Sequence, residues 1–194
     1  MKRAFVIAMT NEAEAVRPAV GPDDLFFVCG VGKVNAAAAT QQAIDAGATE
    51  IVNAGVCGGF DPQMKVGDVF EVSSAVEYDF DLAQLNGTRV GQLDEMDTPY
   101  LPLAVSGKFP TRVLATGDRF NDSDDDLSVL SDLGCTLRDM EGAAIAHVCV
   151  KAGVTCRALK CVSDVKGRGS MTGQYCENLA RCLECLRNAV ISWI

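Results

Sequence analysis

Short apolar runs alternate along the chain with longer stretches of helical character. Apolar positions predict strands at residues 2–9, 25–29, 50–54, 68–76, 111–116 and 156–162. Three- and four-residue apolar spacing, or Ala-rich sequence free of Gly and Pro, predicts helices at about 11–18, 34–46, 139–153 and 178–193. Strands that alternate with helices indicate an α/β fold with a largely parallel, covered sheet.

The same pattern indicates one domain over residues 1–194. There is no internal repeat and no linker rich in Pro, Gly and Ser. Residues 78–103 and 166–172 are typical of loops, the second of a mobile one because of its glycines and polar residues. The acidic stretch 122–126 favours a solvated helix start over a metal site.

Net charge and the length of the apolar runs exclude two classes of binding partner. With 17 Lys plus Arg against 26 Asp plus Glu, the net charge is -9, so the chain would repel a nucleic-acid backbone. No apolar run approaches the roughly 18 residues of a membrane span, and no basic leader with a cleavage site precedes the first strand. We therefore expect no nucleic-acid and no membrane partner.

Seven of the nine cysteines are scattered singly through apolar segments. Only Cys182 and Cys185 form a CxxC pair, which lacks the further Cys or His ligands that a metal site needs. We therefore expect reduced core residues, no metal, and a reducing compartment, the cytoplasm.

In an open α/β sheet, ligands bind beyond the carboxyl ends of the strands. The predicted strand ends carry the glycine-rich segments GVGK (30–33) and GVCGG (55–59), neither of which satisfies a P-loop or a dinucleotide-binding pattern. The second segment is either a tight turn or a place where a ligand approaches the backbone closely.

Three carboxylates are candidates for acid–base work. Glu12, Glu141 and Asp164 each lie next to apolar sequence, where a carboxylate is costly unless it is hydrogen-bonded. The alternative is a structural role in the first turn of a helix, which fits Glu12 and Glu141. His147 lies mid-helix between apolar neighbours and is interpreted as a core residue, so a Ser-His-Asp triad is not expected.

Taken together, these residues resemble the nucleoside phosphorylase/nucleosidase superfamily, and most closely the 5'-methylthioadenosine/S-adenosylhomocysteine nucleosidases. The most specific match is DMEGAAIAHVC (139–149) followed by SDV (163–165). The likeness runs collinearly over nearly the whole chain through AMTNEAEAV (8–16), CGVGKVNAAAA (29–39), NAGVCGGFDPQMKVGDV (53–69), GQL (91–93) and TGDRFN (116–121). It implies a mixed central sheet flanked by helices in a single domain, and no cofactor.

The resemblance also implies an activity, the hydrolysis of the N-glycosidic bond of a purine nucleoside through a cation-like ribosyl transition state. Glu12 would activate water, Glu141 would hold the ribose hydroxyls, and Asp164 would protonate the leaving purine. Asp164 then needs a raised pKa in a dry site. The implied substrate-binding residues are Ala8, Met9, Val31, Val56, Cys57, Gly58, Phe120, Asn121, Asp139, Met140, Glu141 and Ser163, with Phe120 stacking on the base and Met140 packing on the sugar.

The chain departs from the family pattern at three places. Val56 replaces a serine, Lys160 replaces an arginine, and the loop 79–95 carries polar residues where the family presents apolar ones to the 5' group. The 5' substituent is therefore left open. Because such loops come from a neighbouring subunit in the family, the resemblance implies a homodimer.

Hydrolysis is favoured over phosphorolysis, since an acidic group after the first strand repels phosphate and the serine that binds it is absent. The alternatives are a futalosine hydrolase, a purine nucleoside phosphorylase, and a nucleoside-binding relative with weak catalysis.

Overall fold

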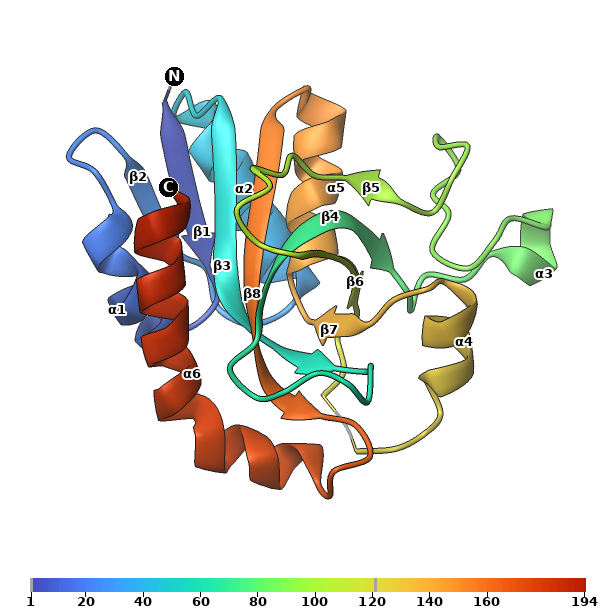
Figure 1. The fold of residues 1–194 in the computed structure, drawn as a ribbon. Coiled ribbons are helices and arrows are strands. Elements are labelled where there is room, and N and C mark those ends of the chain that lie inside the picture. Colours follow the sequence, from blue (N-terminus) through green and yellow to red (C-terminus); the bar gives the residue numbers. More distant parts are fainter. Residues whose placement is uncertain (1, 121) are drawn as a thin grey trace.

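The computed structural model describes residues 2–120 and 122–194. Its described residues form one mixed sheet with helices on both faces (Figure 1), which confirms the predicted fold class. The strands are β1 (Arg3–Ile7), β2 (Leu25–Val28), β3 (Glu50–Gly59), β4 (Val69–Glu77), β5 (Leu101–Pro102), β6 (Thr111–Thr116), β7 (Leu137–Asp139) and β8 (Thr155–Val165).

The sheet has a parallel half and a reversed half. Strands β2, β1, β3 and β8 run parallel, while β4 pairs antiparallel with β8 and β7 pairs antiparallel with β3. Because β4 also pairs with β6, and β6 with β7, the strands β3, β8, β4, β6 and β7 close into a ring. The sequence pattern alone does not reveal this closure, since it depends on which distant strands pair.

Helices cover the sheet in two groups. The helices α1 and α6 pack together on one face, and α2 and α5 on the other (Figure 1). The bounds are α1 (Thr10–Val16), followed by a 3₁₀ turn (Arg17–Ala19), α2 (Lys33–Asp45), α3 (Ala83–Asn86), α4 (Leu127–Asp132), α5 (Gly142–Ala152) and α6 (Met171–Trp193).

The two faces are packed with different side chains. On the α6 side, Trp193 and Leu186 are buried with Phe5 of β1. On the other side, alanines such as Ala36 and Ala143 bring α2 and α5 close to the sheet. Small side chains let the helix backbones approach the sheet, and larger residues of the same cluster, such as Leu137 and Ile145, fill the remaining space. None of the helices in the described part of the chain has both the length and the apolar character of a membrane span.

Several predicted boundaries are wrong in an informative way. The segment 55–59 is not a turn but the second half of β3, since β8 hydrogen-bonds along the whole of it. The strand β8 likewise continues through residues 163–165 instead of ending before them. Ladder hydrogen bonds from neighbouring strands outweigh the local flexibility of the glycines.

Helix starts also differ from the prediction. Asp139 ends β7, and α5 begins only at Gly142. The helix α6 begins at Met171, seven residues before the predicted start, because Ser170 caps it by accepting a hydrogen bond from the Gly173 N–H. The predicted mobile loop is therefore limited to residues 166–170, while the stretch 78–103 contains α3 and β5.

Candidate active site

A cavity of about 360 Å³ opens where the carboxyl ends of β1, β3 and β8 meet the start of α6. This is the edge at which ligands bind in parallel sheets, and the volume lies in the range of small-molecule sites. Its lining residues are Ala8, Met9, Glu12, Val31, Val56, Cys57, Gly58, Phe120, Arg138, Asp139, Met140, Glu141, Ser163, Asp164, Thr172, Tyr175 and Cys176.

Glu12 is held in place by two backbone groups. Its Oε1 accepts the Val56 N–H at 2.8 Å, and its Oε2 accepts the Met9 N–H at 3.2 Å. The second bond closes the first turn of α1 as a capping box, which confirms the structural interpretation of Glu12, while its function as a base stays a prediction. Burial raises the pKa of Glu12, although the Lys160 charge acts in the opposite direction. A carboxylate with a raised pKa is a stronger base.

The glycines of β3 make room for the two predicted catalytic carboxylates. A Cβ at Gly55 would lie 2.6 Å from Glu12 Oε1, and a Cβ at Gly58 would lie 3.1 Å from Asp164 Oδ1. Neither glycine has a positive φ. These glycines are therefore explained by close side-chain approach, and not by the tight turn that was one of the two predictions.

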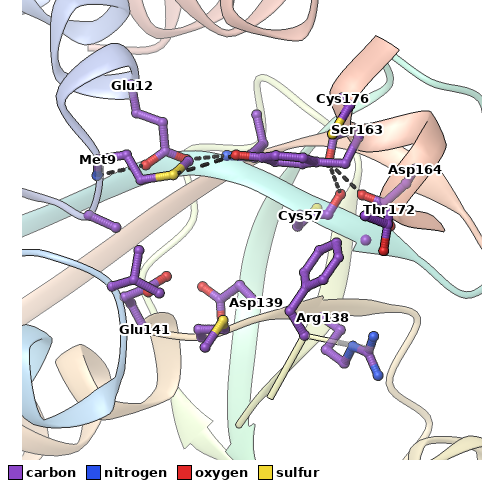
Figure 2. Close-up of a pocket in the computed structure, with 17 residues that line it drawn as sticks. Met9, Glu12, Cys57, Arg138, Asp139, Glu141, Ser163, Asp164, Thr172 and Cys176 are labelled. Atoms are coloured by element: carbon purple, nitrogen blue, oxygen red, sulfur yellow. Dashed lines mark hydrogen bonds between the residues drawn. The ribbon is translucent and has the colours of Figure 1, made fainter. Parts of the chain in front are cut away.

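Asp164 occupies the opposite end of the cavity from Glu12 and Met9 (Figure 2). Its Oδ2 accepts the Ser163 hydroxyl at 2.6 Å, whereas its Oδ1 is buried and has no hydrogen-bond partner among the described residues. Burial raises the pKa of Asp164 to about 6. Such a group carries a proton more readily than an ordinary Asp and has a free oxygen to offer it to a ligand.

A second group of carboxylates lies across the cavity. Glu141 Oε1 accepts the Gly32 N–H at 2.8 Å, and Asp139 Oδ2 accepts the Gly142 N–H at 2.9 Å. Burial and the nearby Asp139 raise the pKa of Glu141. Asp139 also accepts the Thr116 hydroxyl and is thereby fixed between β6 and α5.

Lys160 supplies the cation that this group requires. Its Nζ lies 2.8 Å from Asp139 Oδ2, and its side chain is only 2% exposed. Burial alone would lower the pKa of Lys160, but Asp139 and Glu141 outweigh that effect and raise it. The lysine is therefore charged and neutralises one of the two carboxylates of this group, Asp139.

The residues predicted to form the site lie around this one cavity. Every one of them lines the cavity except Asn121, which lies outside the described residues. Their contribution to ligand binding stays a prediction.

Sequence reasoning missed four lining residues. Thr172, Tyr175 and Cys176 come from the first turns of α6, and Arg138 from β7. The available signal was Ser170, a typical N-cap before Met171, which would have placed the helix start correctly. Nothing in the sequence indicated Arg138.

Asp126 corrects the prediction for residues 122–126. It is buried, and its carboxylate binds Arg119, the Tyr78 hydroxyl and Arg138, whose Nη1 lies 3.2 Å away. This cluster lies behind the Asp164 end of the cavity, where Arg138 points away from the cavity (Figure 2). The other residues of the stretch, 122–125, are exposed, and Asp122 among them accepts a hydrogen bond from the Met171 N–H at the start of α6.

Two further predictions concern His147 and the cysteines. His147 is not a core residue, because its side chain is a quarter exposed and its Nδ1 lies 2.8 Å from Glu77 Oε1. All nine cysteines are free and six are buried, while Cys176 is exposed. Within the described residues, no three His, Cys, Asp or Glu side chains converge as metal ligands would.

Comparisons with known proteins agree with this architecture. A family model described as the phosphorylase superfamily matches residues 25–190. A 5'-methylthioadenosine/S-adenosylhomocysteine nucleosidase of Colwellia psychrerythraea is 34% identical over 172 residues, which cover 77% of this chain and 70% of the relative.

Two solved structures share the fold at low identity. The 5'-methylthioadenosine/S-adenosylhomocysteine nucleosidase of S. pneumoniae, solved with a transition-state inhibitor, superimposes with a TM-score of 0.88 at 17% identity and covers 100% of this chain and 98% of that one. The futalosine hydrolase of Helicobacter pylori gives a TM-score of 0.86 at 19% identity, over 99% and 97% of the two chains. At such identities the structures establish the fold.

Proposed function

The chain belongs to the phosphorylase superfamily, and from this premise we propose that it hydrolyses the N-glycosidic bond of an adenine nucleoside. The substrate class is 5'-methylthioadenosine, S-adenosylhomocysteine or a similar nucleoside, and the products are the purine base and a ribose derivative. Both its curated relatives and its site chemistry support this activity. The protein would then act in methionine salvage.

The observation that carries the proposal is the pair of buried carboxylates at opposite ends of one apolar cavity. Glu12 and Asp164 are 3% and 1% exposed, and both have a raised pKa. Cleavage of a glycosidic C–N bond leaves positive charge on the sugar and negative charge on the purine. One carboxylate near the sugar and one proton donor near the base oppose both charges as they develop.

Asp164 acts as the general acid in this mechanism. Its unpaired Oδ1 offers a proton to N7 of the purine, and Ser163 fixes the orientation of the carboxyl group. Phe120, which also lines the cavity, stacks on the base. Protonation of N7 converts the purine into a neutral leaving group, which lowers the barrier to bond cleavage.

Glu12 acts as the general base. Its two backbone hydrogen bonds orient the carboxylate, and its raised pKa suits proton removal from water. Water attacks the ribosyl carbon on the face opposite the departing purine. Val56 has no hydroxyl to orient this water, so the role of the family's serine is lost at this position.

Glu141 binds the ribose hydroxyls. The Gly32 N–H holds one of its oxygens, and Met140 beside it packs on the sugar. Lys160, paired with Asp139, keeps the local charge from becoming so negative that the carboxylates take up protons. Negative charge near the sugar also stabilises the ribosyl cation.

Hydrolysis fits this site better than phosphorolysis. Glu12 and Glu141 would repel a phosphate dianion at the position of attack. Arg138 is the one cation among the lining residues, and it lies at the base end, paired with Asp126. A futalosine hydrolase is the second candidate, since such an enzyme has the same fold at a TM-score of 0.86.

We further propose that the protein is a homodimer in the cytoplasm. The polar loop 79–95 then lies near the 5' end of the partner's cavity, as the family pattern implies. The free state of all nine cysteines suits a reducing compartment.

Base release measured with and without phosphate tests the function. We expect adenine release from 5'-methylthioadenosine at the same rate in both conditions. Glu12→Gln should lower kcat by about 10²–10⁴-fold with a nearly unchanged Kd for the nucleoside. Strictly phosphate-dependent release would contradict the proposal, and so would unchanged turnover in the Gln variant. Binding without release from any nucleoside would favour a non-catalytic relative.

A further inference from the structure

Tyr175 places a hydroxyl group in the cavity that the family pattern did not predict. The residue lies in the second turn of α6 and lines the cavity. Its ring contacts the edge of Phe120 at a centroid distance of 5.8 Å and an angle of 64°, and its hydroxyl donates to Met9 Sδ at 3.6 Å. The ring therefore spans the cavity from the base-stacking residue to Met9.

The hydrogen bond to Met9 is a weak one. A thioether sulfur is a poor acceptor, and a carbonyl, hydroxyl or ether oxygen would form a stronger bond with the same donor. Burial raises the pKa of Tyr175, so its hydroxyl keeps its proton at neutral pH and remains a donor. An oxygen atom of a bound molecule can therefore replace the sulfur with a gain in hydrogen-bond strength.

The Tyr175 hydroxyl lies at the end of the cavity where the 5' group of a bound nucleoside is expected. Figure 2 shows Met9 and Glu12 at one end, Asp164 at the other, and Glu141 across from Met9. A purine protonated by Asp164, on a ribose held by Glu141, directs its 5' carbon away from Asp164. That end of the cavity holds Met9 and, hydrogen-bonded to it, the Tyr175 hydroxyl.

Charge at this end limits what the 5' group can be. Glu12 and Glu141 lie there, and Arg138, the one cation among the lining residues, is at the other end. A carboxylate on the 5' substituent would find like charges and no cationic partner inside the cavity. A small uncharged 5' group with an acceptor oxygen is not repelled by these carboxylates and needs no cationic partner.

We propose that Tyr175 is a specificity-determining residue that donates a hydrogen bond to an oxygen at the 5' position of the nucleoside. The preferred substrate class is then a purine nucleoside with a small uncharged 5' group, above all the free 5'-hydroxyl. This inference rests on the proposed nucleosidase function and narrows it, because S-adenosylhomocysteine, whose 5' substituent carries a carboxylate, would then be a poor substrate.

Three nucleosides and one conservative variant test the proposal. Adenosine carries the 5' oxygen, whereas 5'-deoxyadenosine and 5'-methylthioadenosine do not. Tyr175→Phe should lower kcat/KM for adenosine by about tenfold, the usual value of one hydrogen bond, and change the other two by less than about twofold. Tyr100→Phe is the matched control, because it removes a hydroxyl bonded to the Leu133 carbonyl outside the cavity. The control should leave all three values unchanged.

Two outcomes would overturn the proposal. An equal loss of kcat/KM with all three nucleosides would mean that the Tyr175 hydroxyl orients the attacking water or stabilises the fold. No loss with any nucleoside would mean that this hydroxyl does not bind the substrate.

Binding keeps this test separate from the proposed function. Formycin A, an adenosine analogue with an uncleavable C–C bond, should bind Tyr175→Phe about tenfold more weakly than the wild-type protein, and 5'-deoxyadenosine equally well to both. If this binding difference appears while no nucleoside is hydrolysed, the hydrolase function fails and the specificity of Tyr175 stands.

Discussion

At the scale of single residues, the site depends on the hydrogen bonds that two carboxyl groups accept. Glu12 is held by backbone N–H groups, and Asp164 has one hydroxyl partner and one unpaired oxygen. These differences suit the two carboxyl groups to the different roles that we propose for them, Glu12 as a base and Asp164 as an acid.

The pKa of Asp164 determines how activity depends on pH. Since burial raises it to about 6, and the acid form gives up the proton, turnover should fall as pH rises through about 6. Asp164→Asn should lower kcat by about 10²–10⁴-fold at pH 5.5 and remove this descending limb. The measurement is the pH profile of adenine release.

Asp23→Asn, in an exposed turn, is the control and should retain the wild-type profile. A pH profile that keeps its descending limb near 6 in the Asp164 variant would show that another group titrates there.

Residue-level prediction from the sequence succeeded where chain position and chemistry were both informative. Glu12, Glu141 and Asp164 follow apolar segments and do line one cavity. The prediction that Asp126 is solvated was wrong, because it was based on the acidic neighbours of this residue. In the structure Asp126 forms ion pairs with two arginines. A single sequence does not show which member of a charged run turns inward.

At the scale of elements, the start of α6 determines one wall of the cavity. Ser170 accepts the Gly173 N–H, and the Asp122 carboxylate accepts the Met171 N–H at 2.7 Å and the Ser170 hydroxyl at 2.8 Å. These contacts hold the first turn of the helix against Asp122. They thereby position Tyr175 one turn further on.

Removal of the cap should therefore loosen the cavity wall. Ser170→Ala should lower the free energy of local opening at the start of α6 by about 1 kcal/mol and raise KM with little change in kcat. Amide hydrogen exchange at residues 173–176 measures the opening.

The matched control is Ser192→Ala at the exposed end of the same helix. It should leave exchange at residues 173–176 unchanged. Equal exchange in Ser170→Ala and the wild-type protein would mean that Asp122 alone maintains the helix start.

At the scale of the whole molecule, strand pairing brings the charged residues together. Asp164 of β8 and Arg138 of β7 both pair with Gly58 of β3, one on each side. Lys160, four residues before Asp164 on the same strand, is buried where β8 lies between β3 and β4. A buried cation at this place holds carboxylates from separate elements in one core.

The global stability should depend on this lysine. Lys160→Met leaves the Asp139 and Glu141 carboxylates without their cation, and we expect the free energy of unfolding to fall by about 3–5 kcal/mol at pH 7.5. The raised pKa of Lys160 means that its contribution is complete at neutral pH and is lost only when pH rises above the range of an ordinary lysine. Urea unfolding followed by circular dichroism measures the difference.

The loss of stability in Lys160→Met should be smaller at pH 5 than at pH 7.5. At the lower pH, Glu141 and Glu12, whose pKa values are raised, take up protons instead of remaining charged. Lys65→Met, at an exposed position, should change stability by less than about 0.5 kcal/mol at either pH. A loss for Lys160→Met that is equal at both pH values would indicate a packing effect and not an electrostatic one.

The sequence by itself determined the α/β alternation, most element cores and the three carboxylates, because hydrophobic period and local residue chemistry are properties of neighbouring residues. It did not determine that β3 continues through its glycines, that five strands close into a ring, or that Asp126 is buried. Those features depend on pairing and packing between segments far apart in the chain. The position of Tyr175 against Met9 was decided in the same way, by tertiary structure alone.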